Sequence, residues 1–462
     1  MTLSASIYIL LISLFASIVF NGFFRNIANN NKILIDLPDK SRKFHARATP
    51  LTGGISIFAA CLLSTFLLEG LSDLTGIHVQ TNINNEILQK DNNFLNQNVS
   101  KKYQVNEKNY EVLIDINQNP ENLSVEVISE NMPVPSSLKI IPRSDNQFEV
   151  ILPDSSSSVY KYNEGEVTKL ASGIQPLKTS GIENFGISVD FFSFSLLFCG
   201  ALLIIFMIFD DIKGIKASYR LLFQATLALL VVLMTGVALA DLGDIFGFGV
   251  INLGYFSTIF TVFCIVGLIN AFNMSDGLNG ICASFGMIPL VMIMLFSNAQ
   301  YGLLVPIGAL LGFLIYNLGY FGKKRSVFLG DHGSNTIGFL IAMVLISASQ
   351  VDQTINPVTA LWLVALPLLD CLGVIISRIL KGIQPFRPGR DHLHHKLLDI
   401  GFSSESILGI FILSTVVLSS IGFGLEYFYP SKEYLSFYLF ILFTSAYFVF
   451  IKTKLTKNAK HI

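Results

Sequence analysis

The chain has 462 residues, of which 52% are hydrophobic and 14% are charged, and its formal net charge is −1. An average soluble domain carries about 25% charged residues, so this composition excludes an ordinary soluble enzyme. The near-neutral charge gives no support for nucleic-acid binding or for an acidic disordered chain. Apolar stretches of about 20 residues recur along the chain and are long enough to cross a hydrocarbon core of roughly 30 Å. The composition therefore predicts a polytopic membrane protein.

Eleven apolar stretches are predicted to be membrane-spanning helices. They cover residues 3–24, 53–71, 189–209, 219–240, 255–272, 280–297, 302–321, 335–350, 357–376, 406–424 and 434–451. With the N-terminus outside, most lysines and arginines fall in loops on the inner side, and Lys432 is the only one in the short outer loops. The positive-inside rule therefore predicts an all-α fold with the N-terminus outside and a cytoplasmic tail at 452–462.

Residues 74–187 differ in composition from their surroundings, and they separate the predicted helices of 1–73 from those of 188–451. Their apolar residues alternate with period two at 110–116, 123–127 and 148–152, and turn-forming residues lie between these stretches. This pattern predicts a small β-rich insertion on the extracytoplasmic side, and the alternative is a disordered linker. No catalytic motif is recognisable in it.

The loop between the first two predicted helices is strongly basic. Arg42, Lys43, His45 and Arg47 lie close together there, ahead of the glycine pair at 53–54. Such a cluster is suited to holding phosphate groups. The alternative interpretation is that these residues only anchor the inner side of the membrane protein.

Two adjacent carboxylates, Asp210 and Asp211, end the third predicted helix, and Arg220 follows shortly after. Acids beside a membrane are costly unless they are paired or bind a cation, and close carboxylates can shift each other's pKa so that one acts as a base. Alternatively, the pair only marks the water interface.

Amide and carboxylate side chains gather in two further inner loops. Asn273, Asp276 and Asn279 follow the fifth predicted helix, and Asp331 lies between glycines before the eighth. Their oxygen atoms suit Mg²⁺, which takes few protein ligands and keeps water or substrate phosphate. Free backbone N–H groups at a helix start also favour phosphate. Helix capping is the alternative for both loops.

The last inner loop contains Arg387, Arg390, His392, His394 and His395. Arginine forks and histidine donors suit an anionic diphosphate. A zinc site and a solvated basic loop are the alternatives, although no cysteine lies nearby to complete a zinc site. Asp370, near the inner end of the ninth predicted helix, is either a functional acid or a structural partner of a basic residue.

These motifs, in this order and on one side of the membrane, resemble those of the polyprenyl-phosphate N-acetylhexosamine-1-phosphate transferases, which are relatives of phospho-N-acetylmuramoyl-pentapeptide transferase. The resemblance covers residues 1–73 and 188–455. The pattern His392-Leu-His394-His395 is similar to the branch that makes undecaprenyl-diphosphate N-acetylhexosamines. The sequence departs from bacterial members at Asn279, where they usually carry Asp.

The resemblance implies transfer of a sugar 1-phosphate from a UDP-sugar, most simply UDP-N-acetylglucosamine, to undecaprenyl phosphate with release of UMP. It implies the bacterial inner membrane, a cytoplasmic active site and a first membrane step of cell-surface polysaccharide synthesis, such as O-antigen. It also implies Mg²⁺, or Mn²⁺, as cofactor. The roles that it implies are catalytic for Asp210 and Asp211; metal-binding for Asn273 and Asp331; and substrate-binding for Arg220, Asn279, His392, His394 and His395. The residues themselves add Asp276 to the catalytic candidates and Arg42, Lys43, His45 and Arg387 to the substrate-binding candidates.

Two other functions remain open from the sequence. One is the pentapeptide transferase of peptidoglycan synthesis, and the other is a transporter of an anionic lipid, which would need polar residues and broken helices near the bilayer midplane. The partners expected are the lipid phosphate and the UDP-sugar, with an extracytoplasmic partner for the insertion and a homodimer as further expectations. No nucleic acid is expected.

Overall fold

The computed structural model describes residues 3–38, 47–75, 191–296, 301–385 and 389–450, together with strands between residues 101 and 174. The chain forms two compact units. One consists of Met1–Asn84 and Ile182–Ile462, and the other is Asn85–Gly181.

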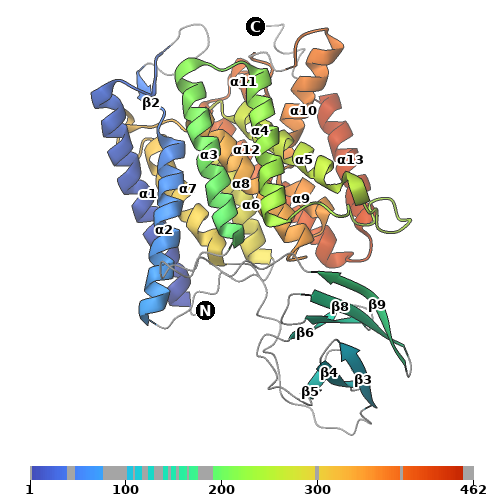
Figure 1. Cartoon of the computed structure of the whole chain (residues 1–462). Coiled ribbons are helices and arrows are strands. Elements are labelled where there is room, and N and C mark those ends of the chain that lie inside the picture. The colour runs from blue at the N-terminus through green and yellow to red at the C-terminus, as the bar shows by residue number, and fades with distance from the viewer. Residues whose placement is uncertain are drawn as a thin grey trace. The chain divides into compact units, whose positions relative to one another are not determined.

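The first unit is built of helices (Figure 1). They are α1 (Leu3–Asn31), α2 (Gly53–Thr75), α3 (Phe191–Lys213), α4 (Ala217–Thr235), α5 (Ser257–Ser275), α6 (Ile281–Phe296), α7 (Leu304–Asn317), α8 (Gly330–Gln350), α9 (Pro357–Leu363), α10 (Ala365–Leu380), α11 (Leu393–Asp399), α12 (Ser404–Phe428) and α13 (Glu433–Phe450). A two-stranded ribbon, β1 (Ile35–Asp36) with β2 (Thr49–Pro50), lies at the same end of the unit as α11.

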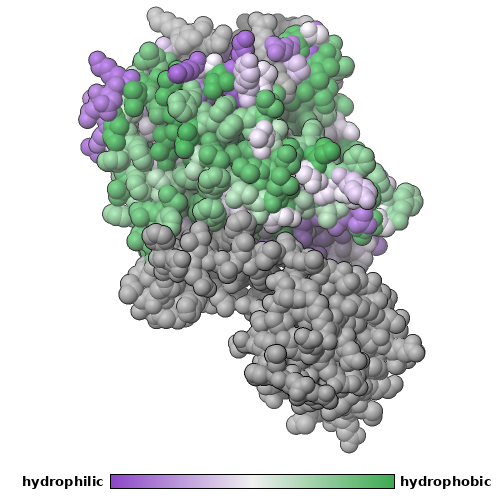
Figure 2. Space-filling view, viewed as in Figure 1, coloured by the Kyte–Doolittle hydropathy of each residue, from purple (hydrophilic) through white to green (hydrophobic). Residues whose placement is uncertain are grey.

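Six helices in the described part of the chain are long and apolar enough to cross a membrane: α1, α3, α4, α5, α8 and α12. Figure 2 shows a broad hydrophobic surface over the helical unit, with hydrophilic residues at the end where β2 and α11 lie and a second hydrophilic patch near the opposite end. The predicted multi-pass membrane protein is therefore confirmed. The continuous span expected at 357–376 is instead two helices, because the chain breaks at Val364 and α9 and α10 meet at 78°.

Helix α8 is the central helix of this unit. Of its most apolar window, 83% is buried, against 28–39% for the other five long helices. It contacts α3, α5 and α2, and Gly338 brings it so close to α5 that an added Cβ would lie 2.8 Å from Ile269 Cα. Small residues permit such close packing within membranes. Helix α8 is therefore packed closely among its neighbours.

Helices α1 and α7 meet along a seam of small residues. Ser17 Oγ of α1 donates to Ala309 O of α7 at 2.7 Å, and Gly308 and Gly312 leave no room for a side chain facing α1. Without a hydrophobic force between helices in lipid, such packing and hydrogen bonds hold them together.

The second unit contains antiparallel strands in two sheets. One sheet has the order β3 (Lys101–Glu107), β4 (Tyr110–Ile116), β5 (Leu123–Ile128); the other has β6 (Lys139–Arg143), β7 (Gln147–Ile151), β8 (Ser156–Asn163), β9 (Glu166–Ile174). The boundaries at 74 and 187 and the extracytoplasmic location stay predictions.

Candidate active site

Asp210 closes the turn between α3 and α4. Gly214 adopts φ +67° after the last turn of α3, and Asp210 accepts hydrogen bonds from Ile215 N at 2.7 Å and Arg220 Nη1 at 3.0 Å. The Asp210 side chain is only 3% exposed, whereas Arg220 is 29% exposed. A buried carboxylate is stable when it is paired and hydrogen-bonded in this way. Asp210 therefore fixes Arg220 at the end of the bundle.

Asp211 is turned toward α8. Its Oδ1 accepts from Asp331 N at 3.1 Å, and its Oδ2 accepts from His332 N at 3.3 Å and contacts His332 Nδ1. An acid placed on the free N–H groups of a helix start interacts favourably with the helix dipole. Asp211 thus joins the end of α3 to the first turn of α8.

Asp331 lies where three helices meet. Arg220 Nη1 of α4 approaches Asp331 Oδ2 at 3.4 Å, and Asn273 Nδ2 of α5 donates to Asp331 Oδ1 at 3.2 Å. The Asp331 side chain is nevertheless 45% exposed. Because Arg220 also binds Asp210, one guanidinium bridges two carboxylates and leaves Asp331 accessible from solution.

Asp276 lies just past the end of α5 and is half-buried. None of the described residues donates a hydrogen bond to its carboxylate, in contrast to Asp210 and Asp211. Burial, with the negative charges of Asp331 and Asp211 adding to it, raises the pKa of Asp276 to about 8. Both carboxylate oxygens of Asp276 are therefore left for a ligand.

The chain after α5 is tied to the end of α7. Asn279 Nδ2 donates to Asn317 O at 3.0 Å, and Asn317 Oδ1 accepts from Gly280 N at 2.7 Å. Asn317 Nδ2 in turn donates to Val327 O at 2.9 Å, ahead of α8. Asn317 therefore sets the spacing between the loops that carry Asn279 and Asp331.

The histidine motif starts α11 and is held by α10. Asp370 accepts from His392 Nδ1 at 2.8 Å and from Leu393 N at 2.8 Å, so of its two sequence interpretations the structural partner is observed. His394 is 2% exposed and lies against Gly277, where no Cβ would fit. Burial is the main cause that lowers the pKa of His394 to about 3. His395 follows on the same helix, and burial likewise lowers its pKa.

The basic loops are described only in part. Arg42, Lys43, His45 and Arg387 lie outside the described residues. The chain after the first loop is anchored beside α8, because Phe328 N donates to Pro50 O at 2.8 Å and Gly53 N donates to Phe328 O at 2.9 Å. The start of the last loop is held by Arg378 of α10, which donates to Pro385 O at 2.7 Å and to Asp391 Oδ2 at 3.0 Å.

The residues present fit a hard divalent cation. Asp331 offers an accessible carboxylate, and the contact of Asn273 with it uses Nδ2 and leaves the amide oxygen of Asn273 for another partner. Among the described residues, no group of three His, Cys, Asp or Glu side chains has the spacing of a metal site. Such a sparse donor set suits Mg²⁺, which completes its shell with water and phosphate, rather than zinc.

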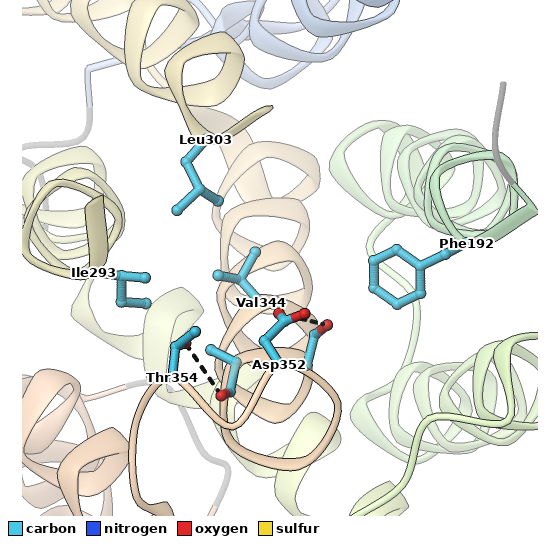
Figure 3. A pocket seen from close by; sticks show the side chains of 8 residues that line it. Phe192, Ile293, Leu303, Val344, Asp352 and Thr354 are labelled. Carbon is cyan, nitrogen blue, oxygen red and sulfur yellow. Dashed lines mark hydrogen bonds between the residues drawn. The ribbon is translucent and has the colours of Figure 1, made fainter. Parts of the chain in front are cut away.

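A small cavity of about 30 Å³ lies near the other end of α8 (Figure 3). Phe192, Ile293, Leu303, Val344, Ser347, Ala348, Asp352 and Thr354 line it. Val344 is thirteen residues beyond Asp331 on one helix, which is about 20 Å at 1.5 Å per residue. The cavity is therefore separate from the acidic cluster, which consists of Asp210, Asp211, Asp276 and Asp331. It is large enough only for water.

The sequence alone did not point to several residues that hold the acidic cluster and its neighbouring loops in place, namely Gln224, Asn317, His332, Asn335 and Arg378. Gln224 and Asn335 lie within predicted spans, where a polar side chain is itself a signal of a buried partner. His332 directly follows the predicted ligand Asp331, and a histidine at the start of an apolar helix is a similar signal.

The fold and the cluster define a multi-pass membrane protein that gathers carboxylates, an arginine and amides at one end of its helical bundle, a set suited to phosphate-bearing ligands. The comparison with known proteins agrees. Residues 193–349 match glycosyl transferase family 4. The chain is similar to undecaprenyl-phosphate alpha-N-acetylglucosaminyl 1-phosphate transferases. The protein of Escherichia coli (strain K12) is 35% identical over 256 residues, which cover 53% of this chain and 69% of that protein.

Two further relatives carry the same description. The protein of Yersinia pestis is 36% identical over 236 residues, covering 49% of this chain and 64% of that protein. The protein of Haemophilus influenzae (strain ATCC 51907 / DSM 11121 / KW20 / Rd) is 37% identical over 247 residues, covering 51% of this chain and 69% of that protein. The chain therefore belongs to this family of membrane phosphoglycosyltransferases, as its motifs predicted.

Proposed function

We propose that this protein transfers N-acetylglucosamine 1-phosphate from UDP-N-acetylglucosamine to undecaprenyl phosphate and releases UMP. The observation that carries the proposal is the meeting of Asp210, Asp211, Arg220, Asn273 and Asp331 at one end of an apolar bundle. A lipid phosphate lies at the headgroup plane and a nucleotide sugar is water-soluble, so their reaction needs a site at a membrane surface. The names of the relatives support this choice of substrates.

The topology proposed with this function has eleven spans and the N-terminus outside. Six long helices support it, and the proposal counts the bent pair α9 and α10 and the shorter apolar helices within α2, α6, α7 and α13 as the other five spans. The acidic cluster then lies on the cytoplasmic face of the bacterial inner membrane, and the β-rich insertion lies outside with any partner it binds. A homodimer remains a further expectation.

The reaction breaks one phosphorus–oxygen bond and forms another. An oxygen of the lipid phosphate attacks the sugar-bearing phosphorus of the UDP-sugar, and the bond to the oxygen of the UMP phosphate breaks, so the sugar keeps its own bond to phosphate. Charge spreads over the nonbridging oxygens in such transfers, and catalysis depends on positioning and on fixed cations. Arg220, held by Asp210 and partly exposed, is placed to face that charge.

The carboxylates divide into two groups by their contacts. Asp210 and Asp211 are used within the protein and set the geometry of Arg220 and of the α8 start, so they orient the nucleophile through these elements. Asp331 is accessible, and Asp276 has free oxygen atoms. Asp331 and Asn273 would hold Mg²⁺, which would neutralise diphosphate charge when bound. Asp276, Asn279 and the histidines of α11 adjoin this group and are the proposed contacts to the substrate.

The test is UMP release by the purified protein with undecaprenyl phosphate and a panel of UDP-sugars, with and without EDTA. We expect turnover with UDP-N-acetylglucosamine that EDTA abolishes. Asp331→Asn should lose at least about 10²-fold in rate, in the range for groups that stabilise transition-state charge. Glu405→Gln, an exposed acid in the first turn of α12, is the matched control and should keep wild-type activity. Full turnover in EDTA, or an active Asp331→Asn protein, would contradict the assignment.

A further inference from the structure

The His332 side chain is enclosed between the first turn of α2 and the first turn of its own helix, α8. Its side chain is 0% exposed in the first turn of α8. A Cβ added at Gly54 would lie 2.7 Å from its Cδ2, and one added at Gly330, which has φ +78°, would lie 2.6 Å from its Cε1. Two glycines on different segments therefore leave space for this imidazole, which packs closely against both.

The hydrogen-bond partners define where the ring proton is. Nδ1 faces Asp211 Oδ2, and a carboxylate can only accept, so Nδ1 carries the proton. Nε2 is buried and has no hydrogen-bond partner among the described residues. An unpaired buried acceptor is less costly than an unpaired buried donor. A ring that carries its proton on Nδ1 satisfies both observations.

This donor completes the set that surrounds Asp211. Without the Nδ1–H group, Asp211 Oδ2 would accept a hydrogen bond only from His332 N at 3.3 Å. Asp211 Oδ1 would still accept the one from Asp331 N at 3.1 Å. The Asp211 side chain is 6% exposed, so water does not replace the lost donor. Because Asp211 holds the backbone of Asp331, a shift of Asp211 moves the carboxylate that Arg220 and Asn273 contact.

We infer that His332 is a positioning residue for the transfer reaction: its Nδ1–H locks Asp211 in the orientation that places Asp331 for the substrate. The inference rests on the proposed function, because it assigns His332 a part in that reaction. Residues that orient a catalytic group through one hydrogen bond typically change activity tenfold to a hundredfold, roughly, when removed.

Three substitutions separate the hydrogen bond from the volume of the ring. Asn places its amide nitrogen near the position of Nδ1, Gln places it near Nε2, and Leu fills the space without a donor. We expect His332→Asn to keep at least about a third of the wild-type kcat, and His332→Gln and His332→Leu to lose roughly tenfold to a hundredfold in kcat. UMP release and the detergent Tm are measured on the same preparations.

A fourth variant measures how much a loss of stability alone lowers kcat. Met343 is 0% exposed on the same helix, far from Asp211, so Met343→Ala should lower Tm through lost packing. The inference requires His332→Leu to lose much more kcat than Met343→Ala at an equal or higher Tm. If activity follows Tm across all variants, His332 acts only in folding and the inference is wrong.

A spectroscopic measurement tests the hydrogen bond without turnover. In the wild-type protein labelled with ¹⁵N-histidine, the resonances that disappear in His332→Asn report the protonation of the two ring nitrogens. A protonated Nδ1 is expected, and a ring protonated only at Nε2 would overturn the inference. Absence of UMP release from the wild type would overturn the proposed function, whereas wild-type turnover with an undiminished His332→Leu rate would overturn this inference alone.

Discussion

Gln224 joins three helices through one buried side-chain amide. From α4 its Nε2 donates to Asn335 Oδ1 of α8 at 2.6 Å, and its Oε1 accepts from Asn270 Nδ2 of α5 at 2.7 Å. Asn335 continues the chain by donating to Asp331 O at 2.6 Å. Gln224 and Asn335 are 2% and 1% exposed, so no water competes for these bonds. The network therefore supports the acidic cluster from within the bundle.

We expect Gln224→Leu to lower the detergent Tm, because it leaves the Asn335 oxygen and one Asn270 donor without their Gln224 contacts. Each buried polar group that loses its partner costs about 1–3 kcal/mol. The control is Thr226→Val on the same helix, an exposed residue whose hydroxyl bonds only its own helix at Leu222. Equal Tm values for the two variants would show that the network contributes nothing to stability.

His394 should make the protein sensitive to acid. Its pKa is lowered to about 3 in the folded protein, against an ordinary value of 6.5. Between these values the unfolded chain binds a proton that the folded protein does not, so stability falls as pH decreases below 6.5. The loss from this residue between pH 7 and pH 5 is about 2 kcal/mol.

Removal of the imidazole should therefore make the stability of the protein depend less on pH below pH 7. We expect the Tm of His394→Gln to fall less between pH 7 and pH 5 than that of the wild type, whatever its value at pH 7. His392→Gln serves as a comparison at the same motif. Parallel Tm curves for wild type and His394→Gln would mean that the ring is not held neutral.

At the scale of elements, the seam between α1 and α7 depends on the absence of side chains. A Cβ at Gly308 would lie 2.7 Å from Leu10 O and 2.9 Å from Ser13 Cβ. A larger residue must push the helices apart and break the bonds that Ser13 and Ser17 make to α7. Close backbone approach of this kind cannot be recovered by rotamer changes.

We expect Gly308→Leu to reduce the amount of folded protein in the membrane and its detergent Tm. Gly409→Leu is the matched control, because Gly409 lies within α12 and a Cβ there meets nothing within 4 Å. Folded yield is followed by size-exclusion chromatography after extraction. A Gly308→Leu protein that matches Gly409→Leu in yield and Tm would show that the seam has more room than the structure gives it.

The start of α8 shows why apolar windows predict an element incompletely. The expected span began at 335, but the helix begins at Gly330. Asp331, Ser334 and Asn335 lower the local hydropathy, yet their side chains make hydrogen bonds to Asn273 and Gln224 on neighbouring helices. The helical continuation depends on partners from α4 and α5, which a window along one segment does not contain.

At the scale of the whole molecule, the insertion is expected to be dispensable for chemistry. The ends that it joins belong to α2 and α3, which contact each other. Under the proposed topology a hydrocarbon core of about 30 Å separates it from the acidic cluster. Closing fixed ends with a loop has a free-energy cost that grows only with the logarithm of loop length.

Replacing residues 76–186 with a short Gly/Ser linker should therefore preserve membrane insertion and most of the UMP-release activity. The extracted amount and Tm of the deletion variant are compared with those of the wild type in the same detergent. An inactive deletion variant at normal abundance and Tm would mean that the topology is wrong or that the insertion communicates with the cluster.

The sequence by itself determined the class of this protein, the approximate positions of its helices and its family, because hydropathy and motif order are properties of one segment at a time. It also named Asp210, Asp211 and Asp331, since acids at the ends of apolar helices stand out locally. Only the tertiary structure decided which acid is enclosed and which is accessible. Asp211 is enclosed by the start of α8 while Asp331 is 45% exposed, although both are aspartates at helix ends. That difference arises from donors supplied by α4, α5 and α8, and pairings between segments more than one hundred residues apart are fixed by packing rather than by local pattern.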